Sequence, residues 1–304
     1  MTSDPICGAV AVLGKPNVGK STFMNKVLGQ KLAIVSPRPQ TTRGAMAGIY
    51  QDDESQIVFY DTPGIHQPKD KLSKYMISEI ENVIEGAEVA LFLVDVKVGI
   101  TDEDRLVAEW LKGFKKPIRI LLNKIDQVKG GRVQQLAGEA AKDLGPWIIR
   151  SISAAKGTGV NALIEEIKRI LPHQPPLFPE DELTDKSMRE IAAEMIREQC
   201  FLQLKQEIPY GVAAVVEKYE EKAPPHPVVI GATLYVEKES QKGILIGTGG
   251  KRLKSIGTSA RVEIEKFLGQ RVFLELWVKV SKDWRKDEDA LKRFGYQIPK
   301  KGSK

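Results

Sequence analysis

The segment GKPNVGKS at residues 14–21 constrains this chain more than any other feature. It matches the pattern G-x-x-x-x-G-K-[ST], follows the apolar run 9–13 and precedes an amphipathic helical pattern over 21–28. Glycines in such a loop let backbone N–H groups surround phosphate oxygens, and the following helix points its positive end toward them. The pattern predicts a phosphate-binding loop in which Lys20 reaches the β- and γ-phosphates and Ser21 binds Mg²⁺. The residues assigned to the nucleotide here are Gly14, Lys15, Pro16, Asn17, Val18, Gly19, Lys20, Ser21 and Thr22.

A second motif, Asn123-Lys124-Ile125-Asp126, follows the apolar run 118–122 and indicates which base is bound. An ionised Asp has only acceptors, whereas guanine offers two adjacent donors and adenine does not, so Asp126 suits guanine. Asn123 is expected to tether the loops around the base, and the stem of Lys124 to cover its face. N-K-x-D alone is as easily a surface turn. About a hundred residues after a phosphate-binding loop, it favours GTP over ATP.

The first 172 residues alternate short apolar runs with longer amphipathic stretches. The apolar runs predict buried strands over 9–13, 57–60, 89–94, 118–122 and 147–152. The amphipathic stretches predict helices over 21–28, 72–85, 102–112, 131–144 and 160–171. This alternation implies a mostly parallel sheet with helices on both faces. We therefore expect an α/β P-loop domain over residues 1–172.

The chain changes character after this domain. A Pro-rich and acidic stretch at 173–184 has the composition of an interdomain linker. Beyond it, the patterns predict a helix over 187–206, strands over 212–218 and 228–236, helices over 241–246 and 251–268, and a strand over 271–280. We expect a second, smaller α+β domain over residues 185–304.

The positive charge is concentrated in the last part of the chain. The whole chain has a net charge of +6, whereas residues 242–304 contain 16 basic and 7 acidic residues, a net charge of +9. Such a patch favours a polyanionic partner, nucleic acid or anionic lipid, and a solvated basic surface is the alternative. Two cysteines, no apolar run of about 18 residues and no secretory signal predict a cytoplasmic protein.

A G-x-x-G segment at residues 247–250 lies between two predicted helices inside this basic region. The helix order is that of a KH module, whose G-x-x-G loop clamps the backbone of about four nucleotides. A glycine-rich helix connection with solvated lysines is the alternative. The residues assigned to RNA are Gly247, Thr248, Gly249, Gly250, Lys251, Arg252 and Lys254.

Residues 1–172 resemble a translation-factor-type GTPase domain, whose five motifs occur here in order. The segment 61–64 matches the third motif, which implies that Asp61 holds Mg²⁺ through water and that the Gly64 N–H meets the γ-phosphate. The segment 40–43 matches the second motif, and we assign its metal-binding residue to Thr42, with Thr41 as the alternative. The fifth motif, whose backbone contacts the guanine oxygen, is matched by Ser153, Ala154, Ala155 and Lys156.

One position departs from the Ras-like pattern. Where Ras-like enzymes have a glutamine that orients the attacking water, this chain has Ile65, followed by His66. The sequence resembles the branch of GTPases with a hydrophobic residue there, some of which bind K⁺ through a P-loop asparagine. Asn17 occupies that position, and a loop-stabilising asparagine is the alternative. The residues placed at the reacting phosphate are Lys20, Thr42, Gly64 and Asn17.

A GTPase domain joined by a short linker to a type II KH domain resembles the Era family of bacterial ribosome-assembly GTPases over nearly the whole chain. The stretches that carry the resemblance are residues 14–21, 40–43, 61–64, 123–126, 246–254, Trp284 and the terminal Phe294-Gly295-Tyr296. The resemblance implies slow GTP hydrolysis to GDP with Mg²⁺, binding near the 3′ end of small-subunit ribosomal RNA during 30S subunit maturation, and a loose association with the inner membrane. We expect a monomer.

The sequence also allows two alternative functions. The first is a GTPase of the same branch that acts in tRNA modification or at the membrane, with a C-terminal half that binds protein or lipid. The second is a non-enzymatic RNA chaperone in which the nucleotide is a structural ligand.

Overall fold

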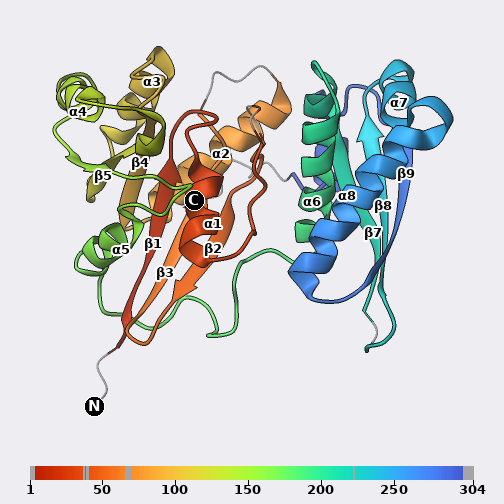
Figure 1. Ribbon diagram of the computed structural model, residues 1–304, viewed down its shortest axis with the longest axis horizontal. Helices are drawn as coiled ribbons and strands as arrows, with labels where there is room; N and C mark the ends of the chain where they lie inside the picture. Colours follow the sequence, from red (N-terminus) through yellow and green to blue (C-terminus); the bar gives the residue numbers. More distant parts are fainter. Residues whose placement is uncertain (1–3, 37, 39–40, 66–69, 222, 297–304) are drawn as a thin grey trace. The chain divides into compact units, whose positions relative to one another are not determined.

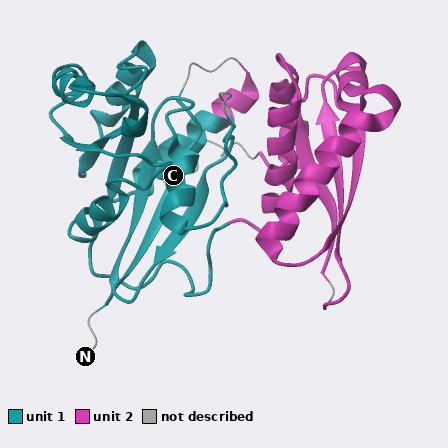
Figure 2. Ribbon diagram, viewed as in Figure 1, with its two compact units in different colours: residues 1–67, 76–185 teal, residues 68–75, 186–304 magenta. Residues whose placement is uncertain are grey.

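The computed structural model describes residues 4–36, 38, 41–65, 70–221 and 223–296 of the chain (Figure 1). It divides into two compact units (Figure 2). The first unit comprises residues 1–67 and 76–185, and the second comprises residues 68–75 and 186–304. Within the described residues, no helix combines the length and apolarity needed to cross a membrane.

The first unit is built on a six-stranded sheet (Figure 1). Its strands are β1 (Ile6–Leu13), β2 (Met46–Gln51), β3 (Ser55–Asp61), β4 (Val89–Asp95), β5 (Ile118–Asn123) and β6 (Ile148–Ser151). They lie in the order β2-β3-β1-β4-β5-β6, with β2 antiparallel to β3 and the other neighbours parallel. The central strand β4 is buried at every residue, because helices cover both faces of a parallel sheet.

Five helices pack on this sheet and form a separate core on each face. They are α1 (Lys20–Leu28), α2 (Lys71–Gly86, of which residues 76–86 belong to this unit), α3 (Asp102–Leu111), α4 (Arg132–Asp143) and α5 (Val160–Lys168). One core contains Ile80, Val107 and Leu136 of α2, α3 and α4, and the other contains Phe23 of α1 and Ile164 of α5. Successive side chains of β1 alternate between the two cores, as the period of a strand requires. The predicted α/β fold with helices on both faces is confirmed.

Two features at the edge of this sheet differ from the expectation. The strand β2 is not predicted, because its short sequence has no clear alternation and it becomes a strand only through pairing with β3. The segment 173–185 belongs to the first unit and runs beside β2, where the Leu183 carbonyl accepts from the Ile49 N–H at 3.0 Å and the Asp185 carboxylate accepts from the Ala47 N–H at 2.9 Å. An edge strand has unpaired backbone groups, so these residues act as an edge cover as well as a connection.

The second unit is a three-stranded sheet covered by helices on one face (Figure 1). Its elements are α6 (Met188–Gln203), β7 (Ala213–Glu220), β8 (Val228–Val236), α7 (Glu239–Ile246), α8 (Lys251–Leu268), β9 (Val272–Val280) and α9 (Glu288–Arg293). The order is β7-β8-β9, with β8 antiparallel to β7 and parallel to β9. From α6 to β9, the order of helices and strands is the one predicted for a KH domain. The short helix α9 is not predicted, since it depends on its N-cap, Asp287, which accepts from two backbone N–H groups of the helix.

Candidate nucleotide site and nucleic-acid groove

The phosphate-binding loop connects β1 to α1 at the carboxyl end of the parallel strands, where ligands bind in open α/β sheets. Gly19 has a φ of 103°, and a Cβ there would lie 2.5 Å from Nδ2 of Asn123, so only glycine fits. A cavity of about 340 Å³ lies over the loop. The loop residues that line it are Pro16, Asn17, Gly19, Lys20, Ser21 and Thr22, whereas Val18 is buried in the core.

The ammonium of Lys20 is buried at the base of this cavity. It donates to the carbonyls of Gly14 at 3.0 Å and Lys15 at 3.1 Å. Burial lowers the pKa of Lys20 to about 8, and the nearby Asp61 carboxylate opposes this shift. A phosphate group in the cavity would place further negative charge beside the buried ammonium and stabilise its charged form, which fits the predicted role of Lys20.

Three oxygen-bearing side chains meet beside Lys20 and fit a Mg²⁺ ion. The Ser21 hydroxyl donates to Asp61 Oδ2 at 2.7 Å, and the Thr42 hydroxyl donates to the same atom at 3.2 Å. Asp61 Oδ1 is buried and has no hydrogen-bond partner among the described residues. Burial raises the pKa of Asp61 against the effect of Lys20, and Mg²⁺ prefers oxygen ligands of this type. Thr41 instead donates to the Arg38 carbonyl at 2.9 Å, so the geometry favours Thr42.

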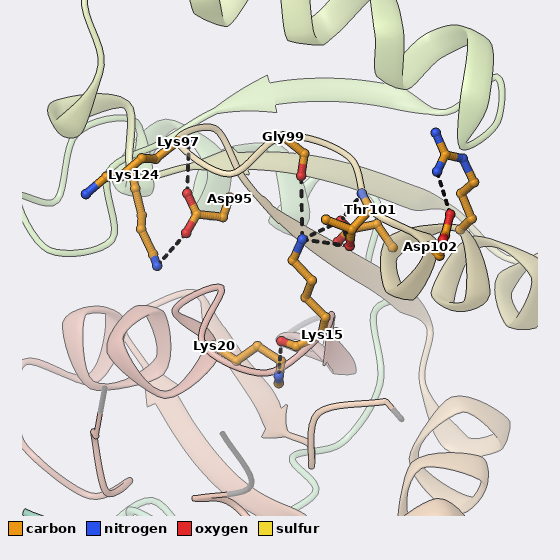
Figure 3. Close-up of polar contacts among 10 residues, drawn as sticks. Lys15, Lys20, Asp95, Lys97, Gly99, Thr101, Asp102 and Lys124 are labelled. Carbon is orange, nitrogen blue, oxygen red and sulfur yellow. Dashed lines mark hydrogen bonds and ion pairs between the residues drawn. The ribbon is translucent and has the colours of Figure 1, made fainter. Parts of the chain in front are cut away.

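The Lys15 side chain does not line the nucleotide cavity and points toward Gly99 and Thr101, as Figure 3 shows. Its ammonium contacts Asp104 at 2.6 Å, Thr101 Oγ1 at 2.9 Å and the Gly99 carbonyl at 3.5 Å. Both charged side chains are buried, and Thr101 with Asp104 forms the capping box of α3. Neither Thr101 nor Asp104 belongs to a nucleotide-binding sequence motif. Their capping-box spacing indicates a helix start, but it does not show that the first turn of α3 holds the phosphate-binding loop.

The guanine motif is joined to the phosphate-binding loop through side chains. Asn123 donates to the Val18 carbonyl at 2.8 Å and accepts from the Ala154 N–H at 2.9 Å, so it tethers two loops as expected. The Lys124 ammonium contacts Asp95 Oδ2 at 2.6 Å (Figure 3). It also donates to the Asn17 carbonyl at 2.6 Å. Asp95, which belongs to none of the predicted motifs, ends β4 and orients Lys124 across the loop.

The Asp126 carboxylate is exposed at the edge of this motif. It accepts from the Ser153 hydroxyl at 2.5 Å, which orients it. Ser153 and Ala154 are buried, whereas Ala155 is exposed beside them. A guanine base in this position would meet an acceptor-only group held in place by the fifth motif.

The third motif ends in contact with the phosphate-binding loop. A Cβ at Gly64 would lie 2.6 Å from Cγ of Pro16, so the backbone there comes close to the loop. Ile65 is 1% exposed and packs in the core with Leu13 and Ile80, which means that it does not face the cavity as a water-orienting residue would. His66, like Gln40 of the second motif, lies outside the described residues.

In the second unit, the G-x-x-G segment forms a tight turn between α7 and α8. Gly249 has a φ of 58° and Gly250 a φ of 75°, and a Cβ at either would meet no atom within 4 Å. Thr248 begins this turn, and a Cβ at Gly247 would lie 2.8 Å from Cβ of Arg252. The turn is therefore an exposed stretch of backbone that a phosphate can approach closely.

The basic residues after this turn are exposed at the start of α8. Lys251 and Lys254 form no ion pair with any described residue. The Arg252 guanidinium donates to the Ile244 carbonyl at 3.0 Å, so it is partly engaged within the unit. A groove of about 340 Å³ extends from Gly250 along α8, with Leu274 and Leu276 of β9 as its opposite wall. Its apolar floor and basic rim suit a single nucleic-acid strand.

Comparison with protein-family models matches a GTPase family in the first unit and an RNA-binding domain family in the second. Residues 9–124 match a family described as 50S ribosome-binding GTPase, and residues 207–285 match the KH domain family.

Comparison with curated proteins finds relatives along nearly the whole chain. GTPase Era from Alkaliphilus metalliredigens is 44% identical over 290 residues, which are 95% of this chain and 98% of the relative. GTPase Era from Geotalea uraniireducens is 46% identical over 292 residues, which are 95% and 97% of the two chains.

Two solved structures have the same fold over almost their full length. Era in complex with MgGDPNP and nucleotides 1506–1542 of 16S ribosomal RNA superposes with a TM-score of 0.91 at 39% identity, covering 97% of this chain and 100% of that one. A variant of Era from Aquifex aeolicus bound to GDP and AlF₄⁻ gives a TM-score of 0.90 at 39% identity, covering 96% and 99%.

Proposed function

The chain belongs to the Era family of GTPases, and we propose that it couples GTP binding and hydrolysis to the binding of small-subunit ribosomal RNA during 30S subunit maturation. The solved relative that holds both a GTP analogue and a 16S ribosomal RNA fragment supports the combination of these two ligands. The family match favours RNA over the protein or lipid partner that the sequence also allowed.

The first unit supplies the nucleotide chemistry. Lys20 would contact the β- and γ-phosphates, and Ser21, Thr42 and Asp61 would hold Mg²⁺, which neutralises charge that develops on the phosphates. The side chain of Ile65 has no polar group that could orient the attacking water, so we predict slow intrinsic hydrolysis. Thr42 and Gly64 lie in the segments that would meet the γ-phosphate, which makes them the parts that differ between the GTP and GDP states.

The second unit supplies the RNA site, and one observation carries this proposal. The positive-φ backbone of the exposed Gly249 and the half-buried Gly250 lies beside Lys251, which forms no ion pair with any described residue, and Gly250 lines the groove of α8 and β9. Single-stranded RNA would place its phosphates against the glycines and its bases in the groove. Duplex RNA should compete poorly, because such a groove requires unstacked nucleotides.

The test is the affinity of the full chain for RNA with nucleotides 1506–1542 of 16S ribosomal RNA, measured by fluorescence anisotropy. Gly249→Asp places a negative charge where phosphates should lie, and we expect at least a hundredfold loss, on the order of 3 kcal/mol. Gly249→Asn is the matched control, because it has the same size without the charge and asparagine also adopts positive φ. The Asp variant should bind more weakly than the Asn variant, and the gap should narrow at high salt.

Circular dichroism and GTP binding show whether the variants are folded. A folded Gly249→Asp protein that binds this RNA as tightly as the wild type would show that the RNA site lies elsewhere. The same assay with GDP and with a non-hydrolysable GTP analogue tests the coupling. Equal RNA affinity in the two states would contradict it.

We also propose that the protein acts as a cytoplasmic monomer that contacts the inner membrane peripherally. The membrane part rests on the family resemblance. Sedimentation of the full chain with anionic vesicles tests it, and no vesicle-bound fraction at low salt would contradict the membrane part.

A further inference from the structure

The sheet of the second unit has a second face, which the helices α6 and α8 do not cover (Figure 1). On β9, Leu274 and Leu276 face α8, so the alternate residues face the other way. Two of these, Phe273 and Trp277, are among the large apolar side chains exposed to solvent, at 52% and 47%. We call this surface, made of Phe273, Glu275 and Trp277, the outer row of β9.

The Trp277 ring is held in place by its neighbour strand. A Cβ at Gly231 of β8 would lie 3.2 Å from Cζ3 of Trp277, so the indole packs against a backbone position that has no side chain. Gly231 is buried, with Lys218 Cβ of β7 at the same distance from this position. The ring therefore has one side on the sheet and substantial area left for a ligand.

The other end of this face is already covered. Tyr235 of β8 packs against Phe294, with ring centroids 4.5 Å apart, and Phe294 packs in turn against the buried Trp284. Trp284 also donates its indole N–H to the Gly211 carbonyl at 2.9 Å. Trp277, by contrast, has no hydrogen-bond partner in the part of the chain that the structure describes.

The charges around the outer row suit a nucleic acid whose bases face the sheet. Arg271 and Lys279 are exposed at its two ends and form no ion pair with any described residue. Glu275 lies between the rings; it is an acceptor that suits base amino groups and repels phosphates. Phe273 and Trp277 are about 13 Å apart along the strand, which leaves room for more than one nucleotide.

The outer row is also close to the groove described above. β9 is the last strand of the sheet, and its two faces carry the groove wall and the outer row on alternate residues. A strand of RNA that leaves the groove at this edge needs to cross only one β-strand to reach Trp277.

We propose that the outer row of β9 is a second RNA contact, on which one or two bases stack after the strand leaves the G-x-x-G groove. This rests on the proposed RNA function of the second unit and extends it to nucleotides beyond those held by the groove. Stacking of a base on an aromatic side chain contributes about five- to a hundredfold in affinity, independently of base identity.

The test compares nested fragments of the 1506–1542 RNA, from about four to about twelve nucleotides, on the full chain. Trp277→Ala should weaken binding of the longer fragments about tenfold and leave the shortest groove-bound fragment unchanged. Trp277→Phe should retain most of the affinity, and Phe273→Ala should give an independent loss of a few-fold. Leu202→Ala on α6 is the control, because Leu202 is 48% exposed and lies outside both surfaces.

The outcomes separate this proposal from the function it rests on. Loss of RNA binding in Gly249→Asp, together with unchanged binding of all fragments by folded Trp277→Ala and Phe273→Ala, would overturn the second contact and leave the groove in place. Equal weakening of short and long fragments by Trp277→Ala would also overturn it, because the groove itself would then be affected. A dimer in light scattering that Trp277→Ala dissociates would assign the outer row to a second copy of the chain instead.

Discussion

The nucleotide site and the G-x-x-G turn at residues 247–250, which we call the KH loop, both have glycine backbone that phosphates could approach, but the side chains around the two differ in burial and hydrogen bonding. In the nucleotide site, Lys15, Lys20 and Asn123 are buried and hydrogen-bonded to other parts of the chain. Beside the KH loop, Lys251 and Lys254 are exposed and form no ion pair with the described residues.

This difference indicates how each site recognises its ligand. A network of buried, oriented groups rejects a ligand that leaves one of them unpaired, and the cost of such a mismatch is large. Exposed lysines attract any phosphate chain and lose their effect as salt screens them. We therefore expect large, all-or-none effects of substitutions in the first unit and small, salt-dependent effects of basic residues in the second.

The largest expected effect concerns the base. Asp126→Asn should weaken GTP about a thousandfold, on the order of 4 kcal/mol, because the amide presents a donor to the guanine donors. Xanthosine nucleotides, whose ring carbonyl accepts from an amide, should then bind better than GTP. Calorimetric titration with GTP, ATP and xanthosine triphosphate measures this, and the wild type should prefer GTP over ATP by a similar factor.

Asp126 is exposed and accepts one hydrogen bond from Ser153, so its substitution should leave the nucleotide-free fold intact. Ser153→Ala removes that hydrogen bond and the one that the Ser153 hydroxyl accepts from the Lys156 N–H at 3.1 Å. It is the matched control, because it leaves the Asp126 carboxylate in place, and it should cost tenfold or less. Comparable affinities of the wild type for GTP and ATP would show that the base is not read by this carboxylate.

The second prediction concerns the buried pair behind the phosphate-binding loop. Lys15→Met keeps the length of the side chain but leaves the Asp104 carboxylate buried without its cation, which should cost about 3 kcal/mol of unfolding free energy. Because the Lys15 carbonyl also accepts from Lys20, GTP affinity should fall as well. Urea unfolding and GTP titration measure the two effects.

A double variant makes this prediction specific. Lys15→Met with Asp104→Leu replaces the pair by apolar groups and should recover at least half of the lost stability. Losses that simply add in the double variant would mean that the pair does not act as a unit. The exposed Arg105, which pairs with Asp102 and Asp143 in the same unit, provides the control, and Arg105→Met should cost much less stability than Lys15→Met.

The comparison of the two sites also explains what the sequence could and could not predict. The phosphate-binding and guanine motifs, and the alternation of strands and helices, depend on local spacing, so they predict the first unit and its main ligands. The G-x-x-G loop is predicted only with its neighbouring helices and charge. In each case the signal lies in residues that are close together in the chain.

The features that the sequence does not predict depend on contacts between segments that are distant in the chain. Asp95 and Asp104 act on the phosphate-binding loop from more than seventy residues away, and neither belongs to a motif. The segment 173–184 has a linker composition, but the open edge of β2 gives it and the following Asp185 hydrogen-bond partners. The outer row of β9 alternates like any surface strand, and only the packing of Trp277 on Gly231 distinguishes it.

The third prediction concerns the monovalent cation. Asn17 has a φ of 64°, lines the nucleotide cavity and accepts from Lys124 through its carbonyl, so it is held at the edge of the phosphates. We expect hydrolysis to be about tenfold faster in K⁺ than in Na⁺ at equal ionic strength, because a cation there neutralises charge in the transition state. Single-turnover hydrolysis in the two salts measures this. Asn17→Ala should lose the K⁺ effect, and equal rates in both salts with an unchanged variant would remove Asn17 from catalysis.

The smallest expected effect belongs to the basic residues of the KH loop. Lys251→Ala should weaken RNA binding about threefold at physiological salt and reduce the slope of log affinity against log salt by less than one unit, since a single lysine releases at most one counterion. Arg252→Ala should reduce the slope less, because its guanidinium already donates to the Ile244 carbonyl.

The matched control is Lys266→Ala, because Lys266 is exposed in the last turn of the same helix, and this variant should leave the slope unchanged. The measurement is RNA affinity at four salt concentrations for the wild type and the three variants. A Lys251→Ala effect that is large and independent of salt would mean that this lysine is part of an oriented site like that of the nucleotide, and the contrast between the two regions would then fail.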